Sequence, residues 1–129
     1  MSTIAFIGAG NMASAIMGGL IENGFQANNI WACDPSEEKL AELSQDLGVQ
    51  TTTNNAEAVA KADTVILAVK PQIIEAVLTP LQSTFNEKQP LIISVAAGIN
   101  LQSLASWVGG QPAIVRCMPN TPALVGQGA

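Results

Sequence analysis

Short, almost uninterrupted apolar runs recur along this chain, and most are followed by a longer segment with apolar residues at helical spacing. Strands whose residues are nearly all apolar are buried on both faces, which is typical of parallel sheets covered by helices. Repeated units of one strand and one helix therefore predict a mostly parallel α/β sheet. We expect its strands at residues 3–8, 29–33, 49–51, 64–69, 90–98 and 113–122, the last running into a proline-bracketed turn.

The segments between these runs carry the signals that begin and end helices. Ser36 is placed to cap the second helix and Gly48 to end it, while Asn54 or Asn55 is placed to cap the third. Pro80 should kink or divide the fourth. The expected helices are 11–24, 34–48, 54–62, 71–85 and 100–110.

The first turn from strand to helix has the pattern G-x-G-x-x-A, formed by Gly8, Gly10 and Ala13. Gly8 permits a tight turn, Gly10 lets the backbone approach a pyrophosphate, and Ala13 lets the helix pack closely on the strand. The N–H groups at the start of the helix then point at the phosphates. The same glycines could serve only to make a tight turn. We expect a dinucleotide-binding turn in a doubly wound, Rossmann-like fold.

Asp34 follows the second expected strand, where such a site carries an acidic residue about 20 residues beyond the glycines. A carboxylate there accepts hydrogen bonds from ribose hydroxyls and repels a 2′-phosphate, so Asp34 by itself favours NAD. The alternative is that Asp34 opens a turn with Pro35 or caps the next helix.

The distribution of charge argues against a nucleic-acid partner. The net charge is −5, and the five basic residues, Lys39, Lys61, Lys70, Lys88 and Arg116, are scattered along the chain. A protein without a basic stripe lacks the electrostatic footprint of nucleic-acid binding.

Other site classes are excluded by what the sequence lacks. There is no histidine and no cysteine–carboxylate cluster at metal-ligand spacing, so we expect no metal site. No apolar run reaches about 18 residues and no basic segment precedes the first run, so we expect neither a membrane span nor a signal peptide. Cys33 and Cys117 do not form a CxxC pair, and we expect reduced, buried thiols in a cytoplasmic protein.

Three later segments extend the dinucleotide hypothesis: LAVKPQ (67–72), SVAAGI (94–99) and RCMPNTP (116–122). Together with FIGAGNM (6–12), and in this order, they closely resemble the motifs of the Δ1-pyrroline-5-carboxylate reductase family. The resemblance extends over essentially all 129 residues. All four motifs follow expected strands, at the edge of the sheet where ligands of open α/β folds bind.

The resemblance implies that the full-length enzyme catalyses the last step of proline biosynthesis. Members of this family transfer a hydride from NADPH or NADH to the C=N bond of 1-pyrroline-5-carboxylate, giving L-proline. Their N-terminal Rossmann-like domain is followed by a helical domain that dimerises and completes the substrate site. This chain resembles the first domain alone. We therefore expect residues 1–129 to form one NAD(P)-binding domain, truncated before the helical domain, of an enzyme that is a homo-oligomer at full length.

The resemblance also implies which residues lie near the cofactor. It places Asn55 beside the adenosine 2′-phosphate, where Ser36 could also donate, and it favours NADP(H). Asp34 leaves NAD(H) possible. The nicotinamide half is expected to border Ala68, Val69, Lys70, Pro71, Val95, Ala96 and Ala97, and the rest of the turn site comprises Ile7, Gly8, Ala9, Gly10, Asn11 and Met12.

The substrate imine is expected beside Pro119, Asn120 and Thr121. A cyclic iminium is already a good electrophile, so little acid–base machinery is required, and no residue of this chain is assigned as catalytic.

Several residues have plainer interpretations. Lys70 could point into solvent from a strand end, and Arg116 could pair or extend its charge to the surface. Packing rather than chemistry is expected of Met12, Met17, Met118, Trp31 and Trp107.

Two other functions also stay open: a stand-alone dinucleotide-binding module, or a fragment of a related β-hydroxyacid-type dehydrogenase.

Overall fold

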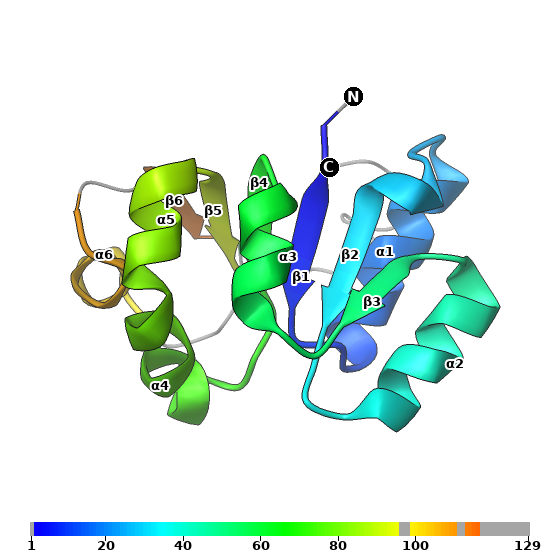
Figure 1. The fold of residues 1–129 in the computed structure, drawn as a ribbon, viewed down its shortest axis with the longest axis horizontal. Coiled ribbons are helices and arrows are strands. Elements are labelled where there is room, and N and C mark those ends of the chain that lie inside the picture. Colours follow the sequence, from blue (N-terminus) through cyan, green and yellow to red (C-terminus); the bar gives the residue numbers. More distant parts are fainter. Residues whose placement is uncertain (1, 96–98, 111–112, 117–129) are drawn as a thin grey trace.

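The computed structural model describes residues 2–95, 99–110 and 113–116, and it contains a single six-stranded sheet (Figure 1). The strand order is β3-β2-β1-β4-β5-β6, and every pair of neighbours is parallel. This order is the one of a Rossmann fold, so the predicted fold class is confirmed. The strands are β1 (Ile4–Ile7), β2 (Ile30–Cys33), β3 (Gln50–Thr52), β4 (Thr64–Leu67), β5 (Leu91–Ser94) and β6 (Ala113–Arg116).

The second and third helices begin at capping residues that the sequence indicated. The Ser36 hydroxyl accepts a hydrogen bond from the Lys39 N–H (3.3 Å), and Gly48 ends the same helix in the left-handed region. Asn54, rather than Asn55, caps the third helix. The helices are α1 (Asn11–Glu22), α2 (Glu37–Leu47), α3 (Asn55–Lys61), α4 (Ile74–Leu78), α5 (Gln82–Lys88) and α6 (Leu101–Val108).

Pro80 divides the segment expected as one helix over 71–85. A 3-10 turn, Thr79–Leu81, separates α4 from α5, and a second 3-10 turn, Pro71–Ile73, precedes α4. Proline lacks an N–H and clashes with the carbonyl four residues before it, so a regular helix does not pass through this position.

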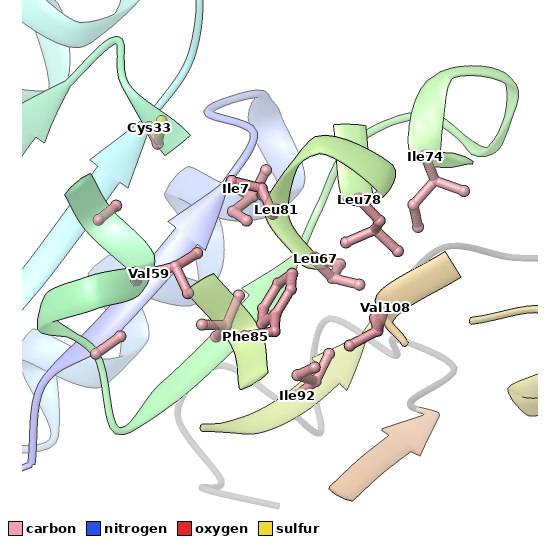
Figure 2. Packing of buried hydrophobic residues seen from close by; sticks show 14 of the residues in the cluster. Ile7, Cys33, Val59, Leu67, Ile74, Leu78, Leu81, Phe85, Ile92 and Val108 are labelled. Atoms are coloured by element: carbon pink, nitrogen blue, oxygen red, sulfur yellow. The ribbon is translucent and has the colours of Figure 1, made fainter. Parts of the chain in front are cut away.

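The two faces of the sheet bury separate hydrophobic clusters. Along β1, Ala5 and Ile7 belong to the cluster covered by α3, α4, α5 and α6, whereas Phe6 belongs to the cluster covered by α1 and α2. Figure 2 shows the first of these clusters, in which Phe85 of α5 packs between β4 and β5 residues such as Leu67 and Ile92. Burial on both faces accounts for the continuous apolar runs seen in the sequence.

The buried face of α1 differs from the one that its largest apolar residues suggest. Ala13 and Met17 are fully buried, while Met12 is 43% exposed and belongs to neither cluster. The expectation that Met12 packs in the core is therefore wrong. Small Ala13 faces the sheet because α1 starts directly after the tight turn and approaches the strands closely there.

Both tryptophans pack against the first cluster, as expected, and both are partly buried. The Lys61 ammonium lies 5.4 Å from the centroid of the Trp31 ring. Among the described residues, no helix is long and apolar enough to cross a membrane.

Candidate dinucleotide site

The turn after β1 lies in close contact with the ends of the neighbouring strands β2 and β4. Gly8 has φ +104°, and a Cβ at this position would lie 2.7 Å from the Ala68 carbonyl oxygen. The Gly8 N–H donates to the Cys33 carbonyl of β2 (2.8 Å), and the Ala68 N–H donates to the Ile7 carbonyl (2.8 Å). Both the backbone conformation and the lack of space require glycine at position 8.

The lack of a side chain at Gly10 has a different explanation. It precedes α1 in extended backbone conformation, and a Cβ built on it would meet no atom of the described chain within 4 Å. No side chain caps the α1 N-terminus among the described residues. The first N–H groups of a helix lack intrahelical acceptors. Open space beside Gly10 and these free donors fit a phosphate group, which needs close approach to the backbone.

A cleft of about 400 Å³ lies next to this turn, at the carboxyl ends of β1, β2 and β4. Asp34 is the one carboxylate that lines it, against the two cations Lys39 and Lys70, among the described lining residues. The local charge therefore suits an anion although the whole chain carries −5. Of the residues expected to contact a cofactor, the cleft brings together Ile7, Gly8, Ala9, Gly10, Asp34, Asn55, Ala68, Val69 and Lys70.

The remaining expected residues fall into three groups. Asn11 lines an adjacent hollow between the start of α1 and the length of α2, whose charged lining residues are Lys39, Glu42 and Asp46. Met12, Ser36, Pro71 and Val95 do not line the cleft. Ala96, Ala97, Pro119, Asn120 and Thr121, and with them Cys117 and Met118, lie outside the described residues.

The cleft also includes residues that sequence reasoning did not assign to it. Cys33 and Thr53 come from the ends of β2 and β3, and Ile73 and Val77 come from the segment after β4. The signal that could have found them is position, since each of these strands ends at the same edge of the sheet. A separate hollow of about 330 Å³, lined by Pro90 and Ala113 among others, lies at the opposite, amino edge.

Asp34 hydrogen-bonds the backbone through both carboxylate oxygens. Its Oδ2 accepts from the Ala9 N–H at 3.0 Å, and its Oδ1 accepts from the Ser36 N–H at 2.9 Å. The second of these bonds forms the turn with Pro35 that the sequence left as an alternative. The first bond joins β2 to the glycine turn and was not foreseen.

Cys33 is fully buried behind the cleft and is a free thiol. Its Sγ donates to Oδ1 of Asn55 at 2.6 Å. Burial raises the pKa of Cys33 to about 11, and the negative charges of Asp34 and Glu57 add to the effect. The thiol therefore stays protonated near neutral pH, and its bond leaves the Asn55 amide N–H₂ available to a ligand in the cleft.

No group of three or more His, Cys, Asp or Glu residues in the described part of the chain could hold a metal ion. The donors among the described lining residues are backbone N–H groups, the Thr53 hydroxyl, the Asn55 amide and two lysines, and groups of these kinds bind a phosphorylated nucleotide.

Comparison with known proteins identifies the family. Residues 3–98 match the family model described as NADP oxidoreductase coenzyme F420-dependent. The chain belongs to this family. It is 50% identical to the pyrroline-5-carboxylate reductase of Pseudomonas aeruginosa, in an alignment that covers all of this chain and 48% of the relative.

Two solved structures carry the same resemblance. A pyrroline-5-carboxylate reductase from Coxiella burnetii has a TM-score of 0.90 and 42% identity, over 95% of this chain and 46% of the other. The Plasmodium falciparum pyrroline carboxylate reductase, solved with NADP bound, has a TM-score of 0.80 and 30% identity, over 95% and 44%. The resemblance expected from the four motifs is confirmed. The chain spans about half the length of the curated relatives it matches.

Proposed function

We propose that this chain is the cofactor-binding part of a pyrroline-5-carboxylate reductase, which reduces the C=N bond of 1-pyrroline-5-carboxylate to give L-proline. The observation that carries the proposal is the glycine turn at the mouth of the cleft, with Gly8 pressed against β4 and Gly10 facing open space. The 50% identity to the Pseudomonas aeruginosa enzyme over the whole chain supports it.

A nicotinamide dinucleotide, when bound, supplies the hydride. In this proposal the backbone at Gly10 and the first turn of α1 hold the pyrophosphate. Ala68 and Val69, at the end of β4, are half-buried in the cleft wall and let a flat ring lie close to the backbone. These residues act by placing the donor carbon against the imine carbon, and orientation of this kind supplies much of the catalysis in cofactor enzymes.

The substrate side of the proposal rests on the family resemblance. Pro119, Asn120 and Thr121 would border the imine, and Ala96 and Ala97 the nicotinamide. We assign no proton donor in this chain. A segment beyond these residues would complete the substrate site and join the subunits of a homo-oligomer.

We propose NADP(H) as the preferred cofactor. Lys39 lines the cleft beside the start of α2 and brings a positive charge to it. Ser36 lies between the lining residues Pro35 and Lys39 without lining the cleft itself, and because its oxygen accepts from the Lys39 N–H, its hydroxyl proton stays free to donate to a 2′-phosphate at the cleft edge. The Asn55 amide N–H₂ is oriented by Cys33. Use of NAD(H) stays compatible with the acidic Asp34, and a cytoplasmic location fits the free thiol of Cys33.

The direct test is reduction of 1-pyrroline-5-carboxylate by the protein at its full natural length, followed as oxidation of NADPH and of NADH. We expect turnover with both and a higher kcat/KM with NADPH, and little or no turnover by residues 1–129 alone. Dinucleotide binding without turnover at full length would favour a binding module. Turnover of a β-hydroxyacid instead would favour the related dehydrogenases.

A further inference from the structure

We infer that Asp34 is a positioning residue for the dinucleotide turn, holding its backbone in the binding conformation, and that it does not select between NAD and NADP. The inference rests on the proposed dinucleotide function, and it assigns Asp34 a role other than the ribose contact expected from its place after β2.

Two hydrogen bonds, donated by consecutive residues of the turn, join the turn to the end of β2. The Gly8 N–H donates to the backbone carbonyl of Cys33 (2.8 Å), and the next N–H, that of Ala9, donates to the Asp34 side chain (3.0 Å). Asp34 lies one residue beyond the end of β2. In a regular strand the Ala9 N–H would point away from β2, but the positive φ of Gly8 turns the chain, so that this N–H meets the Asp34 carboxylate instead.

The Ala9 N–H needs this acceptor. Ala9 is only 6% exposed, and a buried N–H without a partner loses its hydrogen bond to water with nothing in return. With its amide held by Asp34, Ala9 cannot turn that amide toward a ligand, so Gly10 and the first turn of α1 are left to receive the pyrophosphate. The carboxylate thus decides which N–H groups face the cleft.

The side chain and the backbone of Asp34 together join β2 to three other segments. Through Oδ1 the side chain accepts from the Ser36 N–H (2.9 Å) at the start of α2, and the Asp34 N–H itself donates to the Thr52 carbonyl of β3 (3.4 Å). Hydrogen bonds to an ionised group are stronger than neutral ones. The two bound N–H groups also offset the charge that would otherwise repel a nearby phosphate.

A positioning role and a selecting role predict different binding patterns. NADPH, NADH and ADP all place a pyrophosphate on the turn, so loss of the Asp34 hydrogen bond to the turn weakens all three by a common factor. A selecting carboxylate acts on the 2′ position, so its loss changes the ratio of the NADPH and NADH affinities.

The test measures the dissociation constants of NADPH, NADH and ADP for Asp34→Ala and Asp34→Asn in the full-length protein, well below the unfolding temperature. For Asp34→Ala we expect each affinity to fall about tenfold, the order expected of a lost hydrogen bond to a charged group. The NADPH/NADH ratio should change less than about twofold. Asp34→Asn keeps one acceptor oxygen and should lie between wild type and Asp34→Ala.

Asn100→Ala is the matched control, because Asn100 caps α6 through the Ser103 N–H (2.7 Å), on an element whose residues do not line the cleft. It should lower stability and leave all three affinities unchanged. Hydrogen exchange gives a local readout. Relative to the amides of the sheet, the Ala9 amide should lose protection in Asp34→Ala and keep it in Asn100→Ala.

Three results would overturn the inference: a ratio change above about fivefold with ADP affinity retained, unchanged exchange at Ala9, or an equal affinity loss in Asn100→Ala. A wild-type protein that binds none of the three nucleotides would overturn the proposed function as well. That outcome differs from a wild type that binds and an Asp34→Ala variant that binds equally well, which would overturn the positioning role alone.

Discussion

The thiol of Cys33, at the end of β2, donates a 2.6 Å hydrogen bond to Oδ1 of Asn55 in the first turn of α3. Asn55 lies half-buried in the cleft wall, and the bond holds its oxygen away from any ligand. The arrangement depends on a protonated thiol, because a thiolate has no proton to donate to the amide oxygen.

The first prediction concerns alkaline stability. Burial, with the charges of Asp34 and Glu57, raises the pKa of Cys33 from 9.0 to about 11. In the unfolded chain the thiol loses its proton near its ordinary pKa, whereas the folded chain retains it to about pH 11. The thiol's contribution to the free energy of unfolding is therefore complete below pH 9.0 and is lost as the pH rises to about 11.

Denaturant unfolding of wild type and Cys33→Ala across this range measures that contribution, which should be on the order of 2 kcal/mol. Cys33→Ala should be less stable at neutral pH and should show a shallower decline above pH 9.0. Parallel curves for the two proteins would contradict a raised thiol pKa.

The second prediction separates the two glycines of the turn. Gly8→Ala should lower the free energy of unfolding by about 1–3 kcal/mol, because a Cβ there meets the Ala68 carbonyl oxygen and φ is positive. Gly10→Ala should leave stability within about 0.5 kcal/mol and abolish nucleotide binding, because its Cβ enters only the open space. Thermal unfolding and NADPH titration of both variants are the measurements. Retained NADPH binding by Gly10→Ala would mean that the phosphates do not lie against the backbone at Gly10.

The third prediction concerns cofactor preference. Lys39→Gln should weaken NADPH about fivefold and NADH much less, because an exposed charge pair contributes up to about 1 kcal/mol. The NADPH effect should shrink as salt is raised. Lys88→Gln is the control, since Lys88 is an exposed cation in the last turn of α5 and does not line the cleft. Equal losses for the two cofactors would remove Lys39 from the 2′-phosphate site.

The fourth prediction tests the buried face of α1. Met17→Ala should cost about 2–4 kcal/mol in the free energy of unfolding, because the side chain is fully buried between the helix and the sheet. Met12→Ala, five residues earlier and 43% exposed, should change stability by less than about 0.5 kcal/mol. Chemical denaturation of both variants is the measurement, and similar losses would mean that Met12 is also packed.

The sheet and the glycine turn could be predicted because their signals are local. Continuous apolar runs indicate strands buried on both faces, and a strand, two glycines and a helix in succession indicate a phosphate-binding turn. Ser36, Asn54 and Pro80 act on residues within one helical turn of themselves, so their effects on α2, α3 and the break before α5 followed from sequence.

The side-chain partners in the site could not be read in this way. Asp34 is compatible with a ribose contact, a turn or a helix cap, and the choice depends on where the Ala9 N–H lies. Likewise the apolar residues of α1 share helical spacing, but the close approach after Gly8 decided that Ala13 and Met17, and not Met12, face the sheet.

The sequence by itself determined a parallel α/β fold with a phosphate-binding turn, because periodicity and glycine placement act over a few residues. Only the tertiary structure decided that β2 is hydrogen-bonded to that turn through Asp34 and to α3 through Cys33. These bonds join residues 25 and 22 positions apart. Such contacts form only when the parallel strands bring their carboxyl ends to one edge, a proximity that strand order in space, and not distance along the chain, creates.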